Sequence, residues 1–195
     1  MRRRRLRAAL VPGVIFAGLF GAVAALAPQP RLVWNASASM PIGLYGVEVG
    51  RRPQAGELAL IDPPERVAAL LAERGYLPRG VPLLKRVAAS DGALVCRSGS
   101  FVTVDGRGAA RAHARDRSGR PLPRWLGCRR LQRGEYFVLG AAPGSFDSRY
   151  FGPLPAAAVI GTAHPLFTRD APGTPLRWRT GAPHPPSTAY EKEPQ

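Results

Sequence analysis

The sequence predicts a mainly β domain that follows a single N-terminal apolar helix. Two observations lead to this fold class. Residues 8–27 contain no charged side chain, whereas residues 1–7 hold five arginines. Between residues 44 and 163 the patterned segments are short and bounded by Gly and Pro, as strands are, and only one has helical spacing.

The uncharged run at residues 8–27 has the length of a membrane span. As a helix it would reach about 30 Å, which matches the hydrocarbon thickness of a bilayer. The arginines before it favour a cytoplasmic N-terminus and send the chain after Pro30 to the far side. Ala25-Leu26-Ala27 is typical of a signal-peptide cleavage site, but Pro28 directly after it disfavours cleavage. We therefore expect residues 1–30 to form a basic tip and a retained anchor.

The remaining elements follow from hydrophobic period and turn residues. A helix is expected from Pro63-Pro64-Glu65 to Gly75, and a folded domain over residues 31–169. Residues 107–133 are rich in Arg, Pro and Gly and predict an inserted flap or long surface loop, and residues 170–195 a disordered Pro-rich tail. Strands are expected at 44–49, 58–62, 83–88, 135–140 and 157–163, with a hairpin formed by 93–96 and 101–104.

The charge balance is strongly basic. Lys and Arg number 28 against 13 Asp and Glu, a net charge of +15, and Lys85 and Lys192 are the only lysines. Such a charge suits acidic lipid or nucleic acid, although an arginine-biased genome would produce the same composition. A non-enzymatic basic envelope protein that binds DNA or acidic lipid is therefore one alternative.

Two cysteines, Cys96 and Cys128, fall in the part placed beyond the membrane. A disulfide between them would close a loop of about 30 residues and stabilise the fold by about 3 to 4 kcal/mol in the chain-entropy model. Two free thiols remain the other possibility, since spacing does not establish the geometry. The three histidines, His113, His164 and His184, lack zinc-ligand spacing, so we expect no metal and no cofactor.

Two residue types suggest chemistry. Strand alternation places Lys85 on the same face as Leu83 and Val87, where desolvation would lower the pKa of its amine and let it act as a base. Arginine stays protonated and cannot do so. Ser39 lies on the bend Ser37-Ala38-Ser39-Met40-Pro41, a position where a nucleophile can stand. A lysine that extends its amine to water and a serine with only local hydrogen bonds are the alternatives.

Three segments in order resemble the conserved boxes of type I signal peptidases of the Ser-Lys class. They are Ser37–Pro41, Leu83–Val87 and Ser145–Pro153. Three details are most similar to the TraF subgroup, the conjugative transfer peptidases: Asn35, Pro41–Tyr45 and Ser145–Gly152. Gly140-Ala141-Ala142-Pro143 stands where leader peptidases carry Gly-Asp-Asn-Arg, which also favours the TraF subgroup.

The resemblance implies a compact, mainly β core with a short flap, anchored in the inner membrane with its catalytic side in the periplasm. Its substrate would be an exported precursor, a conjugative pilin that some relatives cyclise, and nucleic acid is not an expected partner. A general signal peptidase is the nearest alternative, and a Ser-His-Asp hydrolase using Asp147 with His113 or His164 is a weaker one.

The resemblance also assigns roles to six residues. Ser39 would be the nucleophile and Lys85 the base. Ser37 and the backbone N–H of Ser39 would hold the oxyanion. Three further residues would support these groups: Ser145 by orienting the lysine, and Asp147 and Arg149 as a structural pair.

Overall fold

The computed structural model describes residues 12–22 and 31–179, and the chain divides into two units, residues 1–30 and 31–195. In the first unit, residues 12–22 form a helix whose apolar side chains are exposed, among them Ile15, Phe16 and Phe20. Within the described ranges, no helix has both the length and the apolar character needed to traverse a bilayer. The predicted anchor at 8–27 extends beyond those ranges at both ends.

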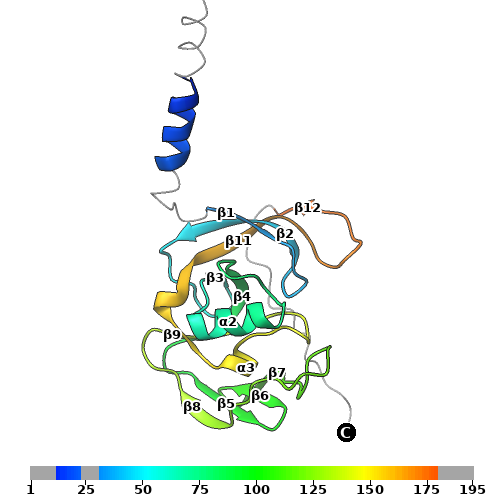
Figure 1. Cartoon of the computed structure of the whole chain (residues 1–195). Helices are drawn as coiled ribbons and strands as arrows, with labels where there is room; N and C mark the ends of the chain where they lie inside the picture. The colour runs from blue at the N-terminus through cyan, green and yellow to red at the C-terminus, as the bar shows by residue number, and fades with distance from the viewer. Residues whose placement is uncertain (1–11, 23–30, 180–195) are drawn as a thin grey trace, which may run out of the picture. The chain divides into compact units, whose positions relative to one another are not determined.

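The second unit is mainly β, as predicted, and contains two antiparallel sheets (Figure 1). The large sheet runs in the order β1 (Leu32–Asn35), β2 (Ile42–Val49), β11 (Val159–Arg169), β3 (Leu58–Ile61), β4 (Leu83–Ala89), β9 (Glu135–Leu139) and β10 (Leu154–Pro155), and β12 (Arg177–Trp178) also pairs with β11. The small sheet runs in the order β7 (Arg107–Arg111), β6 (Phe101–Val104), β5 (Leu94–Ser98) and β8 (Gly127–Arg130). The helices are α2 (Glu65–Glu73), α3 (Ser148–Phe151) and the short 3₁₀ helix η1 (Ala156–Ala158).

Both faces of the large sheet carry a hydrophobic core. Leu83 and Val87 of β4 pack on one face with Leu71 of α2, whereas Leu84 packs on the other with Tyr45. Lys85 lies between Leu83 and Val87 in sequence and pairs across the ladder with Ala59 of β3, which belongs to the first core. The predicted alternation along β4 is therefore confirmed.

Two strands of the small sheet lie within the expected irregular flap. The prediction of an unpatterned segment at residues 107–133 is wrong at both ends, where β7 pairs with β6 and β8 pairs with β5. Every residue of β8 is exposed, so no alternating pattern marked it in the sequence. The hairpin turn is also tighter than expected, because β5 continues to Ser98 and leaves only Gly99 and Ser100 in the turn.

Two strands near the C-terminus differ from the prediction. β11 continues to Arg169 and lies between β2 and β3. The predicted tail boundary is wrong for residues 170–179, because Trp178 of β12 pairs with Phe167 and the two rings lie 4.8 Å apart. Residues 180–195, the rest of that tail, lie outside the described residues.

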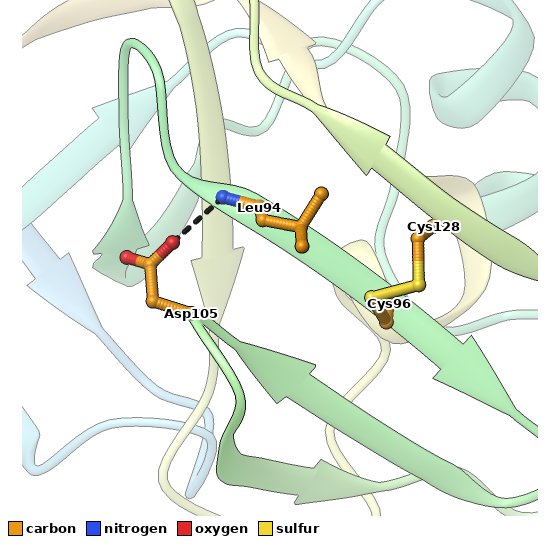
Figure 2. Close-up of a disulfide and its surroundings, with 4 residues drawn as sticks. All are labelled: Leu94, Cys96, Asp105 and Cys128. Carbon is orange, nitrogen blue, oxygen red and sulfur yellow. Dashed lines mark hydrogen bonds between the residues drawn. A yellow bond between two sulfur atoms is a disulfide. The ribbon is translucent and has the colours of Figure 1, made fainter.

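A disulfide joins the central strand of the small sheet to its edge. Figure 2 shows Cys96 of β5 bonded to Cys128 of β8, with the Asp105 carboxylate accepting a 2.8 Å hydrogen bond from the backbone N–H of Leu94. The pair spans 32 residues of sequence. The disulfide therefore closes residues 96–128, which include most of the inserted segment at 107–133, into a loop.

Candidate active site

Lys85 is a buried amine that, among the described residues, donates to one side chain. It is 3 % exposed, and its Nζ donates a 2.8 Å hydrogen bond to the hydroxyl of Ser145. Burial lowers the pKa of the Lys85 amine from 10.5 to about 8, while Asp147 acts to raise it and Arg149 to lower it further. A large part of the amine is thus neutral near pH 8, as a general base requires.

Ser39 lies in the loop between β1 and β2, next to Ser37. The two hydroxyl oxygens are 2.8 Å apart. Ser37 is exposed and Ser39 half-buried, whereas Met40 directly after them is buried in the core. Met40 fixes the loop to the domain and leaves both hydroxyls at the surface, where a peptide can approach.

The loop after β9 brings the two regions together. The Ser39 carbonyl accepts a 2.7 Å hydrogen bond from the backbone N–H of Ala141. Gly140 lies against both partners: a Cβ built there would be 2.0 Å from Ser145 Oγ and 3.2 Å from the Ser39 carbonyl oxygen. The lysine's partner and the backbone of the serine are therefore separated by one glycine. Among the described residues, no hydrogen bond joins the Ser39 hydroxyl directly to Lys85.

Asp147 and Arg149 form a buried ion pair beneath this loop. Arg149 Nη2 lies 2.6 Å from the Asp147 carboxylate, and both side chains are almost completely buried. Arg149 also donates to the carbonyls of Ala142 and Pro143, and Asp147 accepts from the N–H of Gly140. Charge-assisted bonds of this kind hold the backbone of residues 140–143 in place.

All six residues predicted for the site from the resemblance thus lie in one connected network. The sequence reasoning missed Gly140, which it noted only as part of a departure from the leader peptidases. It also gave no role to Asn35, which lies 8 % exposed at the end of β1. The need for a glycine at 140 is explained only by the packing, because a Cβ there would meet Ser145, which folds back from the same loop, and the carbonyl of Ser39.

The arrangement does not assemble the alternative Ser-His-Asp site. The Asp147 carboxylate bonds to Arg149 and Gly140, and the imidazole of His164 lies 2.8 Å from Glu48. In the part of the chain that the structure describes, no hydrogen bond links Asp147 to His113 or His164. Nor do the described residues contain a group of three or more His, Cys, Asp or Glu side chains that could hold a metal ion.

Comparison with known proteins agrees with the order of these elements. A family model described as signal peptidase, peptidase S26, matches residues 3–167. The chain belongs to the signal peptidase S26 family. A crystal structure of a signal peptidase I from Enterococcus faecalis is 21 % identical to this chain, with a TM-score of 0.33. The match covers 57 % of this chain and 97 % of the crystallised one.

Three similar proteins are named TraF. A conjugal transfer protein TraF of Agrobacterium fabrum is 36 % identical over 148 residues, which cover 70 % of this chain and 82 % of the relative. Another TraF, from Agrobacterium tumefaciens, is 36 % identical over 86 % of this chain and 98 % of its own. A plasmid transfer protein TraF of Escherichia coli is 30 % identical over 69 % of this chain and 81 % of the relative. The resemblance to the TraF subgroup is confirmed.

Proposed function

We propose that this chain is a membrane-anchored serine endopeptidase that uses Ser39 and Lys85 to process an exported precursor, a conjugative pilin. The observation that carries the proposal is the buried Lys85 amine, with its pKa lowered to about 8. It bonds to Ser145, and the loop before Ser145 also holds the backbone of Ser39. The peptidase family supports the reaction class. The relatives named for conjugal transfer support the choice of substrate.

The proposed reaction is an acyl transfer. Neutral Lys85 accepts the proton of the Ser39 hydroxyl as Ser39 Oγ bonds to the scissile carbonyl carbon. The Ser37 hydroxyl and the Ser39 N–H donate to the oxygen that becomes negative. The Lys85 ammonium then gives its proton to the departing amine, and water, or the amine of the precursor itself, releases the acyl group. Ser145 keeps the amine aimed throughout.

The proposed anchor is residues 8–27, with the catalytic domain in the periplasm. The exposed apolar helix at 12–22 and the arginines before it support this placement. On β1, Leu32 and Trp34 lie two residues apart on the same side of the strand and are 62 % and 53 % exposed. Exposed apolar and indole side chains of this kind suit the membrane interface.

Mass spectrometry of a candidate pilin, with and without this protein, tests the proposal. We expect a shortened pilin only with the wild-type chain, and none with Ser39→Ala, Lys85→Ala or Lys85→Arg, because arginine keeps the charge but has no accessible neutral form. A linear product differs from a cyclised one by the mass of one water molecule. All variants should remain folded and membrane-bound.

Two other outcomes would contradict the proposal. Efficient cleavage of an Ala-x-Ala preprotein, with no action on the pilin, would favour a general signal peptidase. Strongly salt-dependent binding of nucleic acid that survives Ser39→Ala and Lys85→Ala, together with no processing of either precursor, would favour a basic binding protein.

Thr162→Val serves as a control. Thr162 is buried on β11, outside the site, and the variant should process the precursor as the wild type does.

A further inference from the structure

Asn35 is a buried polar side chain to which the proposed reaction gives no role. Its Nδ2 donates to the carbonyls of Ser37, Met40 and Pro41 at 2.9, 3.1 and 3.0 Å. Its Oδ1 accepts from both the backbone N–H and the hydroxyl of Ser37, each at 3.2 Å. One carboxamide therefore engages the loop on both sides of Ser39.

These partners leave only one orientation for the carboxamide. If the amide were rotated by half a turn, its oxygen would face three carbonyl oxygens and its NH₂ would face the backbone N–H of Ser37. Both contacts are repulsive. Asn35 Oδ1 thus offers Ser37 an acceptor and no donor.

The direction of the Ser37 hydroxyl follows from its single proton. Because Asn35 Oδ1 only accepts, the Ser37 proton is directed to it, and a lone pair of Ser37 Oγ is left to accept from Ser39. The Ser39 hydroxyl is thereby held against Ser37 at 2.8 Å. When substrate arrives, each hydroxyl turns its proton about an oxygen that is already in place. In the proposed reaction the Ser37 proton turns from Asn35 to the oxyanion, and the Ser39 proton turns from Ser37 to Lys85.

We propose that Asn35 is a positioning residue for this reaction, which acts by fixing the Ser37 hydroxyl and, through it, the Ser39 nucleophile. The inference rests on the proposed function and extends it to a residue that does not touch substrate. Replacement by leucine, which has a similar shape, removes all five hydrogen bonds. The loop retains a second support, because the Tyr45 hydroxyl donates to the Pro41 carbonyl at 2.6 Å.

The test is a double-mutant cycle on the full-length chain in detergent, with whichever of the two precursors the wild type cleaves faster. We expect Asn35→Leu to lower kcat about 10- to 100-fold with KM changed less than about threefold, because orientation and not binding is lost. In a Ser37→Ala background the same change should lower kcat less than about threefold, because the group through which Asn35 acts is already absent.

Thr162→Val is the matched control. Thr162, like Asn35, is a buried polar residue, and its hydroxyl donates to a backbone carbonyl, that of Arg51. The Thr162→Val variant should lose thermal stability and keep kcat within about twofold of the wild-type value.

Asn35→Asp keeps the acceptor but sets a carboxylate against three carbonyl oxygens. This variant should therefore be as slow as Asn35→Leu at every pH where Lys85 is neutral.

Each remaining outcome overturns the inference. Equal losses of kcat in the wild-type and Ser37→Ala backgrounds would show that Asn35 acts independently of Ser37. A change confined to KM, or an equal fall in kcat for Thr162→Val, would assign Asn35 to general support of the fold. If the wild type cleaves neither precursor, the proposed function fails and this inference fails with it. If the wild type is active, only the inference is in question.

Discussion

Lys85 sets the pH range in which the proposed dyad can work. Burial penalises the ammonium form and lowers the pKa of the amine to about 8. Below that pH the base is protonated and cannot accept the Ser39 proton, so kcat/KM should rise with pH and level off above about pH 8. Measuring kcat/KM from about pH 6 to about pH 10 checks this. A midpoint near pH 6.5, the ordinary value for histidine, would contradict a lysine base.

Gly140 is required because the hydroxyl of Ser145 occupies the space where a side chain would lie. A Cβ at this position would be 2.0 Å from Ser145 Oγ and 2.6 Å from Ser145 Cβ. We expect Gly140→Ala to displace the partner of Lys85 and to lower kcat by about 10-fold or more.

The chain provides a matched control at Gly144. A Cβ there meets nothing closer than the Arg117 guanidinium at 3.6 Å, an ordinary contact with a flexible side chain. Gly144→Ala should therefore keep kcat within about twofold of wild type. Equal activity of the two alanine variants in steady-state assays would show that Ser145 need not stay where it is.

At the scale of elements, the small sheet is attached to the helix that carries part of the site. Arg97 of β5 donates to the carbonyl of Arg149 and lies over the ring of Tyr150, 5.9 Å from its centre. The indole N–H of Trp125 donates to the carbonyl of Ser148 at 3.1 Å. Both β5 and the segment before β8 are thus bonded to α3.

The Cys96–Cys128 disulfide should stabilise this inserted segment. In the chain-entropy model a cross-link over 32 residues contributes about 3 to 4 kcal/mol to the free energy of unfolding. We expect the double variant Cys96→Ser and Cys128→Ser to lose about that amount in chemical denaturation. Reductant should destabilise the wild type and leave the variant unchanged. A loss below about 1 kcal/mol would mean that the sheet holds together without the cross-link.

The whole molecule consists of two units, and the site lies in the second one alone. Every residue of the proposed network lies between Asn35 and Arg149, inside the unit that starts at Arg31. We expect a chain that begins at Arg31 to fold with a Tm within about 2 °C of the full chain, because a compact unit keeps its own core. It should also lose its association with inner-membrane vesicles.

Thermal melts and vesicle sedimentation check these two expectations separately. A truncated chain that remains unfolded would show that residues 1–30 contribute to the core of the domain. A truncated chain that still sediments with vesicles would assign membrane binding to the domain surface, where Leu32 and Trp34 are exposed.

Much of the fold was predictable because the signals are local. Strand alternation placed Lys85 on the buried side of β4, and turn residues placed α2 between β3 and β4. The strands β1, β7, β8 and β12 were missed because they are short and largely exposed. Their pairing partners define them, and their own sequence pattern does not.

The sequence alone therefore determined the chemical groups, their order along the chain and the burial of the one lysine in the domain. Only the tertiary structure decided that Lys85 bonds to Ser145 and that the loop before Ser145 also holds the backbone of Ser39. Ser39 comes from the β1–β2 loop, Lys85 from β4, and Ser145 from 60 residues further along, after β9. Hydrophobic period reports which side of an element is buried, but it carries no information about which distant element packs there.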